Sequence, residues 1–97
     1  MNRSDAIRRL SKNQDELKAR FAIKSLSIFG SVARDQATLG SDLDILVSFR
    51  ETPGLLKFLE LKSHLEEICQ CSVDLVTEKA LKEQFREQIL MEALDAI

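Results

Sequence analysis

With 97 residues, 44% of them hydrophobic, the chain has material for one small core, so we expect residues 1–97 to form a single domain. Its 14 basic and 16 acidic side chains leave a net charge of -2, and without a basic excess we expect no direct binding of nucleic acid. The sequence also lacks a secretory signal and an apolar run long enough to span a membrane, which favours a cytoplasmic protein.

Hydrophobic periodicity divides the chain into elements in the order helix, strand, short helix, strand, helix, strand, helix. In that order they span residues 4–21, 25–29, 31–36, 43–49, 55–69, 72–76 and 78–97. Ser11 and Gln14 have the spacing of a capping box, so the first helix can break near Ser11. Residues 38–41 are expected to form a loop. This order predicts an α/β (α+β) fold, in which a small mixed sheet of about three strands is flanked by helices.

Two aspartates, Asp42 and Asp44, lie at the start of the second predicted strand. Side chains two positions apart share a strand face, and their Cα atoms should lie roughly 6.5–7 Å apart. Carboxylates so close repel each other, and a divalent cation relieves the repulsion. Asp74 is the one charge in the third predicted strand and completes the group if that strand neighbours the second. Three carboxylates can hold two magnesium ions about 3.5–4 Å apart, an arrangement used for in-line phosphoryl displacement.

A phosphate-binding turn is indicated at Gly30-Ser31, which follows a predicted strand and opens a short helix. Glycine allows the backbone to approach a phosphate closely, and the free N–H groups of a helix start favour an anion. Ser31 adds a hydroxyl donor, and Arg34, one turn along, can face a triphosphate. For Arg34 an ion pair with Asp35 or Glu51 is an equal alternative.

Together these residues resemble a known pattern. Gly30-Ser31, ten intervening residues and Asp42-x-Asp44 are similar to the GSx10DxD signature of the DNA polymerase β-like nucleotidyltransferase superfamily. The stretches 26–34 and 41–47 resemble its minimal nucleotidyltransferase (MNT) family, and residues 73–77 resemble that family's third-acid strand. The resemblance extends over residues 15–94, which is nearly the whole chain.

The resemblance implies a nucleotidyltransferase fold and a set of site residues. The implied catalytic residues, which are also the ligands of two Mg²⁺ ions, are Asp42, Asp44 and Asp74. The implied nucleotide-binding residues are Gly30, Ser31, Arg34 and Ser41. Asp35 departs from the family, which usually has glycine there. Aspartate tolerates a left-handed conformation, but its charge near the triphosphate predicts weakened nucleotide binding.

The resemblance also implies a biological setting. Many stand-alone MNT domains are antitoxins of HEPN-type ribonuclease toxins, and some transfer AMP from ATP to a toxin tyrosine. We therefore expect a Mg²⁺-dependent enzyme that moves AMP from ATP onto a protein hydroxyl, as a type VII-like antitoxin whose partner is a HEPN-type toxin. Two alternatives stay open: an antitoxin that neutralises its toxin by complex formation without catalysis, and one subunit of a split nucleotidyltransferase.

Several other side chains receive plainer predictions. Cys69 and Cys71 are expected to be free, half-buried thiols, because a disulfide across one residue is strained. His64 lies on the polar side of its predicted helix and is expected to be solvated. Met91, Leu94 and Ile97 are open between two interpretations, a place in the core and a partner or homodimer surface.

Overall fold

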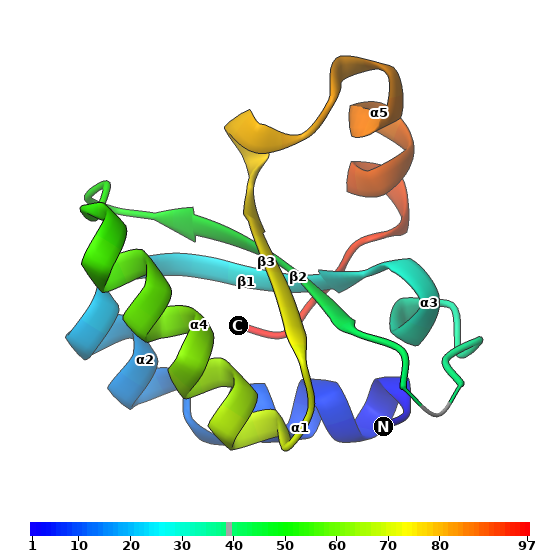
Figure 1. Cartoon of the computed structure of the whole chain (residues 1–97), viewed down its shortest axis with the longest axis horizontal. Coiled ribbons are helices and arrows are strands. Elements are labelled where there is room, and N and C mark those ends of the chain that lie inside the picture. The colour runs from blue at the N-terminus through cyan, green and yellow to red at the C-terminus, as the bar shows by residue number, and fades with distance from the viewer. Residues whose placement is uncertain (39) are drawn as a thin grey trace.

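A four-stranded mixed sheet organises the fold (Figure 1). The structure is a computed structural model that describes residues 1–38 and 40–97, so Leu39 of the expected 38–41 loop lies outside the described residues. The strands are β1 (Ile23–Phe29), β2 (Leu43–Phe49), β3 (Val73–Thr77) and β4 (Leu94–Asp95). Their spatial order is β3-β2-β1-β4, with β3 parallel to β2 and the other two pairs antiparallel.

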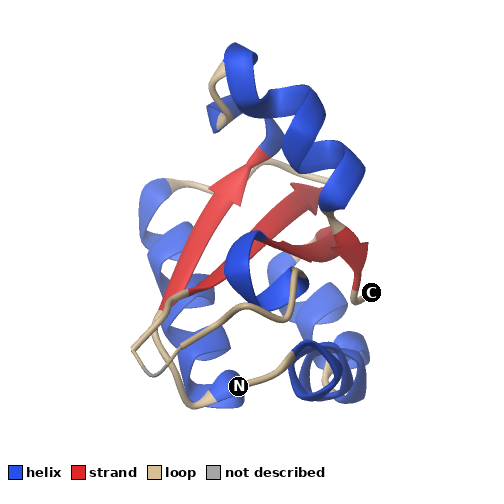
Figure 2. Cartoon of the chain, turned by 90° about the vertical axis from the view of Figure 1, so that its right-hand side faces the viewer, coloured by secondary structure: helices blue, strands red, loops and turns tan. Residues whose placement is uncertain are grey.

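The helices lie on both sides of this sheet. They are α1 (Arg3–Lys12), α2 (Gln14–Phe21), α3 (Gly30–Ala33), α4 (Leu55–Cys69) and α5 (Glu83–Glu92), with a 3-10 turn η1 (Glu78–Ala80) before α5. Helices α1, α2 and α4 cover one face, and α5 lies on the opposite side (Figures 1 and 2). The expected small mixed sheet flanked by helices is therefore confirmed, with one short strand more than the sequence predicts.

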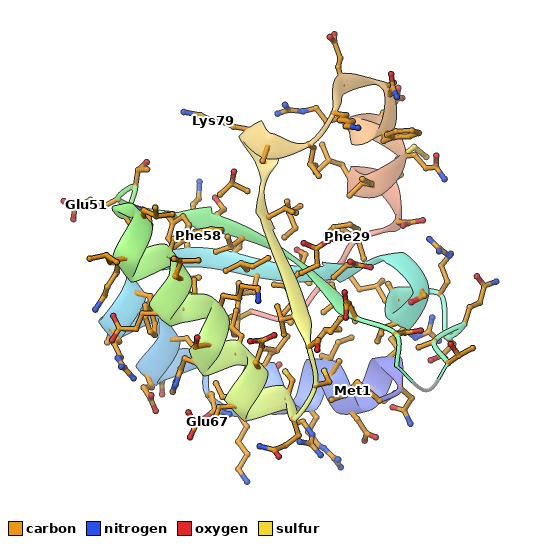
Figure 3. The ribbon with its side chains drawn as sticks, viewed as in Figure 1. Met1, Phe29, Glu51, Phe58, Glu67 and Lys79 are labelled. Carbon is orange, nitrogen blue, oxygen red and sulfur yellow. The ribbon has the colours of Figure 1, made fainter. Side chains whose placement is uncertain are left out.

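The hydrophobic core fills the space between the sheet and helices α1, α2 and α4. Alternate residues of β2 are buried, so Leu43, Ile45 and Val47 face these helices while the residues between them face the other way. Helix α4 connects β2 to the parallel strand β3, and it contributes Leu61 and Leu65 to the same core. At the far end of β2 the rings of Phe49 and Phe58 lie 6.4 Å apart, with Phe58 labelled in Figure 3. One face of the sheet thus packs against these helices, and the other carries Asp44 and Ser48 together with half-buried Leu46.

The first predicted helix is broken near Ser11, as the sequence allows, and the break lies at Asn13. The Asn13 side chain donates a hydrogen bond to the Arg9 carbonyl at 2.8 Å, which ends α1. Ser11 does not cap; its hydroxyl donates to the Ala96 carbonyl at 2.6 Å. A tertiary contact with the end of the chain has therefore replaced the predicted local cap.

The prediction of one helix over residues 78–97 was wrong at both ends. The helix begins only at Glu83 and ends at Glu92, and residues 94–95 form β4 against β1. The free edge of β1 offers unpaired backbone groups, and Ala96 N–H donates to the Leu26 carbonyl at 2.8 Å. Strand pairing at this edge outweighs the helical spacing of the apolar side chains that predicted a longer helix.

The remaining side-chain predictions have mixed outcomes. Both cysteines are free, as expected, and Cys71 is half-buried, but the prediction that Cys69 is half-buried was wrong, because its side chain is fully buried in the core. The prediction that His64 is solvated was wrong: its side chain is 18% exposed. Its ring packs 5.7 Å from that of Phe21, because α4 lies against α2.

Over residues 1–38 and 40–97, no helix has both the length and the apolar character needed to span a membrane.

The apolar residues near the end of the chain divide between the two interpretations left open above. Leu94 and Ile97 are half-buried and pack against the core. Met91 is 81% exposed and lies on α5. Only Met91 of the three therefore remains a candidate for contact with another molecule.

Candidate active site

Asp44 and Asp74 lie side by side on the face of the sheet that α1, α2 and α4 leave uncovered. Strands β2 and β3 are parallel, and their register pairs Asp44 directly with Asp74. The residues that flank each aspartate in the chain are buried, so both carboxyl groups point away from the core. Asp44 is half-buried and Asp74 is exposed. Strands β2 and β3 are therefore neighbours, which is the condition under which Asp74 joins the acidic group.

The Asp44 carboxyl group is electrostatically strained in this position. Burial, then the charges of Asp74 and Asp42, and a hydrogen bond with Asp74 together raise its pKa from 3.8 to about 6. The Arg34 guanidinium acts in the opposite sense and lowers this pKa. A half-buried acid facing like charges is a group that a bound cation stabilises.

Asp42 occupies a different kind of position from the other two acids. It lies just before β2 rather than in it, and it is exposed. Its charge reaches Asp44, but within the described parts of the chain no three His, Cys, Asp or Glu side chains are arranged as a ready metal site. The Asp44–Asp74 pair nevertheless fits a divalent cation, because Mg²⁺ binds one or two carboxylates and completes its shell with phosphate oxygens and water.

Gly30 brings the predicted phosphate-binding turn into contact with this pair. Register places Phe29 of β1 opposite Asp44 of β2, so the next residue, Gly30, lies over the Asp44 carboxylate. Gly30 has φ +72°, and a Cβ built there would fall 3.0 Å from Asp44 Cγ and overlap Oδ2. Both the left-handed backbone and the close approach require glycine at this position. The sheet therefore brings together the Gly30-Ser31 turn and the Asp42-x-Asp44 motif, although ten residues separate Ser31 from Asp42 in the sequence.

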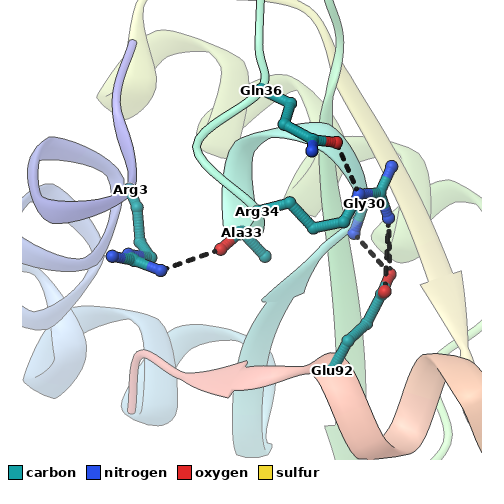
Figure 4. Close-up of polar contacts among 6 residues, drawn as sticks. All are labelled: Arg3, Gly30, Ala33, Arg34, Gln36 and Glu92. Atoms are coloured by element: carbon teal, nitrogen blue, oxygen red, sulfur yellow. Dashed lines mark hydrogen bonds and ion pairs between the residues drawn. The ribbon is translucent and has the colours of Figure 1, made fainter.

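Arg34 is held by a residue that sequence analysis missed, Glu92 at the end of α5 (Figure 4). One terminal nitrogen of Arg34 donates to both Glu92 carboxylate oxygens, at 3.0 and 3.2 Å. The same carboxylate accepts a hydrogen bond from Gly30 N–H at 3.1 Å. The Arg34 Nε donates to Gln36 at 3.1 Å. No local pattern in the sequence marks Glu92, which lies 58 residues beyond Arg34.

Neither of the partners considered for Arg34 is the one observed. Asp35 adopts φ +57°, the left-handed conformation expected of it. Its carboxylate pairs with Arg3 at 3.4 Å and accepts from the Arg3 backbone N–H at 3.2 Å. The charge of Asp35 is therefore partly offset by α1.

The two predicted serines lie in separate segments, one in α3 and one in the loop before β2. Ser31 is the second residue of α3 and is half-buried. Ser41 closes the loop before Asp42: its hydroxyl accepts from Thr38 N–H at 3.0 Å and lies 3.2 Å from the Thr38 hydroxyl. The Ser41 hydroxyl is thus engaged within its own loop.

Cavities of different character lie along β2. One of about 270 Å³ opens on the uncovered face beneath α5, with serine hydroxyls and Asp95 in its lining. A larger one of about 470 Å³ lies where β2 ends, beside the start of α4, and its one acidic residue is Glu78. The carboxylate pair lies at the starts of β2 and β3, so the larger cavity is not the place of the acidic chemistry.

A family comparison agrees with this geometry. The model of the nucleotidyltransferase domain family matches residues 10–97. The protein adenylyltransferase MntA of Thermococcus cleftensis is 41% identical over 85 residues, which cover 88% of this chain and 86% of that protein. The chain therefore belongs to the nucleotidyltransferase domain family.

Solved structures place it further within that family. The structure of a candidate minimal nucleotidyltransferase is 39% identical, with a TM-score of 0.79 and coverage of 97% of this chain and 95% of that one. A more distant structure, of a tri-AMPylated Shewanella oneidensis HEPN toxin in complex with an MNT antitoxin, matches with 19% identity and a TM-score of 0.68. It covers 95% of this chain and 71% of the matched chain, and at that identity it shows the fold alone. The expected resemblance to the minimal nucleotidyltransferases is confirmed, and with it the class of enzyme.

Proposed function

We propose that this chain is a Mg²⁺-dependent protein adenylyltransferase that moves AMP from ATP onto a hydroxyl group of a partner protein. The observation that carries the proposal is the in-register Asp44–Asp74 pair in contact with the Gly30 turn. The similarity to a protein adenylyltransferase supports both the nucleotide and a protein acceptor. The distant likeness to a complex of an MNT antitoxin with a tri-AMPylated HEPN toxin supports a HEPN-type toxin as partner. A tyrosine hydroxyl of that toxin is the acceptor that the family resemblance implies.

In this proposal the three acids hold two magnesium ions, and ATP binds through these ions. Asp42, Asp44 and Asp74 are the ligands, and the ions neutralise the charge of the triphosphate and of the reacting phosphoryl group. Gly30 N–H, Ser31 and Arg34 bind phosphate oxygens, and Ser41 orders the loop that carries Asp42. Asp74 is exposed and next to Asp44, so an acceptor hydroxyl can reach its carboxylate.

The reaction is a displacement at the α-phosphorus of ATP. The acceptor oxygen forms a bond to that phosphorus while the bond to the bridging oxygen of pyrophosphate breaks, and the hydroxyl proton passes to the Asp74 carboxylate. The fixed sheet register positions the acids before ATP binds, which is the kind of preorganisation on which phosphoryl transfer depends.

One observation favours the second candidate, an antitoxin that acts by binding alone. Helix α5 exposes Phe85, Leu90 and Met91, which are 48%, 40% and 81% exposed, and these apolar side chains suit a partner surface. Such a surface serves either function, so it does not by itself separate the two.

The test is a transfer assay with a purified HEPN-type toxin as acceptor. With Mg²⁺ and ATP labelled at the α-phosphate, the proposal predicts label on the toxin and release of pyrophosphate. With ATP labelled at the γ-phosphate it predicts an unlabelled toxin. A stable complex without transfer from any of the four nucleoside triphosphates would instead establish the binding antitoxin.

A further inference from the structure

The Glu92 carboxylate accepts hydrogen bonds from the same donors, Gly30 N–H and Arg34, that the proposed function assigns to the triphosphate. Gly30 N–H and the Arg34 guanidinium both donate to it, at 3.0–3.2 Å, in the arrangement that Figure 4 shows. A carboxylate and a phosphate are both oxyanions, and both accept from a guanidinium and a backbone N–H. The Glu92 side chain is 22% exposed, so this contact is partly shielded from solvent.

Helix α5 is attached weakly apart from this contact. The helix is 10 residues long, from Glu83 to Glu92, and none of these residues is buried. Glu92 makes all the polar contacts that join α5 to α3 in the described part of the chain. A helix with little buried surface has low local stability, so the position of α5 depends on whether Glu92 keeps its partners.

We propose that Glu92 is an internal competitor of the nucleotide, which holds Gly30 and Arg34 until the triphosphate displaces it. The inference rests on the proposed function and adds a regulation of the same site. A triphosphate and the Glu92 carboxylate repel each other and cannot share the same donors. The apparent affinity for ATP is therefore reduced by the fraction of protein in which Glu92 is bound, and displacement releases α5 from α3.

The first test measures the dissociation constant for ATP and Mg²⁺ by calorimetry, without a partner protein. Glu92→Gln removes the charge that pairs with Arg34. Glu92→Asp keeps the charge on a side chain one methylene shorter, which draws it away from its donors. Both variants should bind ATP about two- to fivefold more tightly, the range expected from a half-exposed ion pair. Glu87→Gln makes the same charge change at an exposed position of α5 and should leave the affinity unchanged.

A second test uses hydrogen exchange of the α5 amides, which a generic change of charge would not affect. In the unaltered protein ATP should accelerate exchange over residues 83–92. In Glu92→Gln these amides should already exchange rapidly before ATP is added. Slower exchange on ATP addition would overturn the inference, because it would mean that α5 closes onto the nucleotide.

The two proposals fail in different ways. Equal or weaker ATP binding by both Glu92 variants, in a protein that binds ATP and transfers AMP, overturns the role of Glu92 and leaves the proposed function standing. An unaltered protein that neither binds ATP nor transfers AMP overturns both. Unchanged thermal denaturation of the Glu92 variants establishes that an altered affinity does not reflect a loss of folding.

Discussion

Asp44 of β2 and Asp74 of β3 occupy the same register position on adjacent parallel strands. The sheet thus fixes two carboxylates next to each other, and Asp42 adds a third negative charge within electrostatic range. Burial, and then the charges of Asp74 and Asp42, together raise the pKa of Asp44 to about 6. The protein keeps this unfavourable arrangement in its folded state, which is a common property of sites that bind a cation.

The raised pKa predicts that Asp44→Asn stabilises the protein at neutral pH. Asp44 ionises near 3.8 when unfolded and near 6 when folded. The folded state therefore binds more protons between these values, and the free energy of unfolding falls as pH rises from about 4 to 6. Without metal, Asp44→Asn should add about 1–2 kcal/mol at pH 8 and almost nothing at pH 4.

Thermal denaturation in EDTA at both pH values measures this difference. Asp15→Asn, at an exposed position of α2, is the matched control and should have no such pH dependence. An equal effect of Asp44→Asn at pH 4 and pH 8 would show that the charge of Asp44 is not the source of the instability.

Magnesium should stabilise the folded protein through the same carboxylates. A ligand that binds only the folded state at ten times its dissociation constant adds about 1.4 kcal/mol. For a chain of this size that raises Tm by about 6–10 °C. The increase should be lost in Asp44→Asn and in Asp74→Asn, as measured by scanning calorimetry at pH 8 with and without Mg²⁺. An undiminished increase in both variants would place the metal elsewhere.

Gly30→Ala should damage both stability and transfer. The positive φ of Gly30 and the overlap of a Cβ with Asp44 strain the turn by about 1–3 kcal/mol. Displacement of the Asp44 carboxylate should lower the transfer rate by about 100-fold. Gly54→Ala is the control, because Gly54 has an extended backbone (φ -73°, ψ 172°) and no atom within 4 Å of an added Cβ. Normal transfer by Gly30→Ala would show that this close approach has no part in catalysis.

The exposed side of α5 should contribute to partner binding. Met91→Lys should leave stability within about 0.5 kcal/mol, because Met91 is 81% exposed. It should weaken the complex with a HEPN-type toxin by at least about tenfold, since a central apolar contact contributes more than 1 kcal/mol. Leu56→Lys, at an 83% exposed position of α4, is the control. Calorimetric titration of each variant with the toxin distinguishes the α5 surface from the α4 surface. If only Leu56→Lys weakened toxin binding, the interface would lie on α4 instead.

Much of this site follows from local patterns in the sequence. The residue pattern of Leu43–Phe49 predicted β2 with its observed bounds, and the alternation of strand side chains placed Asp44 on the face opposite the core. The predicted third strand was displaced by one residue, but Asp74 kept its face because its neighbours are apolar. The left-handed conformation of Asp35 is one that the residue type tolerates.

What the sequence did not reveal depends on contacts between distant segments. Strand β4 exists because the edge of β1 offers backbone partners, and nothing in residues 94–95 alone signals a strand. Glu92 resembles any other helix carboxylate until folding brings it to Arg34.

The central claim is that the acids on the uncovered sheet face transfer AMP, and its most direct test is the rate of AMP transfer by Asp42→Asn/Asp44→Asn. The rate should be measured from α-labelled ATP to a HEPN-type toxin under conditions in which the unaltered protein and Asp15→Asn are active. We predict that the double variant still binds the toxin but transfers no detectable AMP and no longer protects cells from it. Full protection by a variant that transfers no AMP, or transfer at the unaltered rate, would contradict the claim.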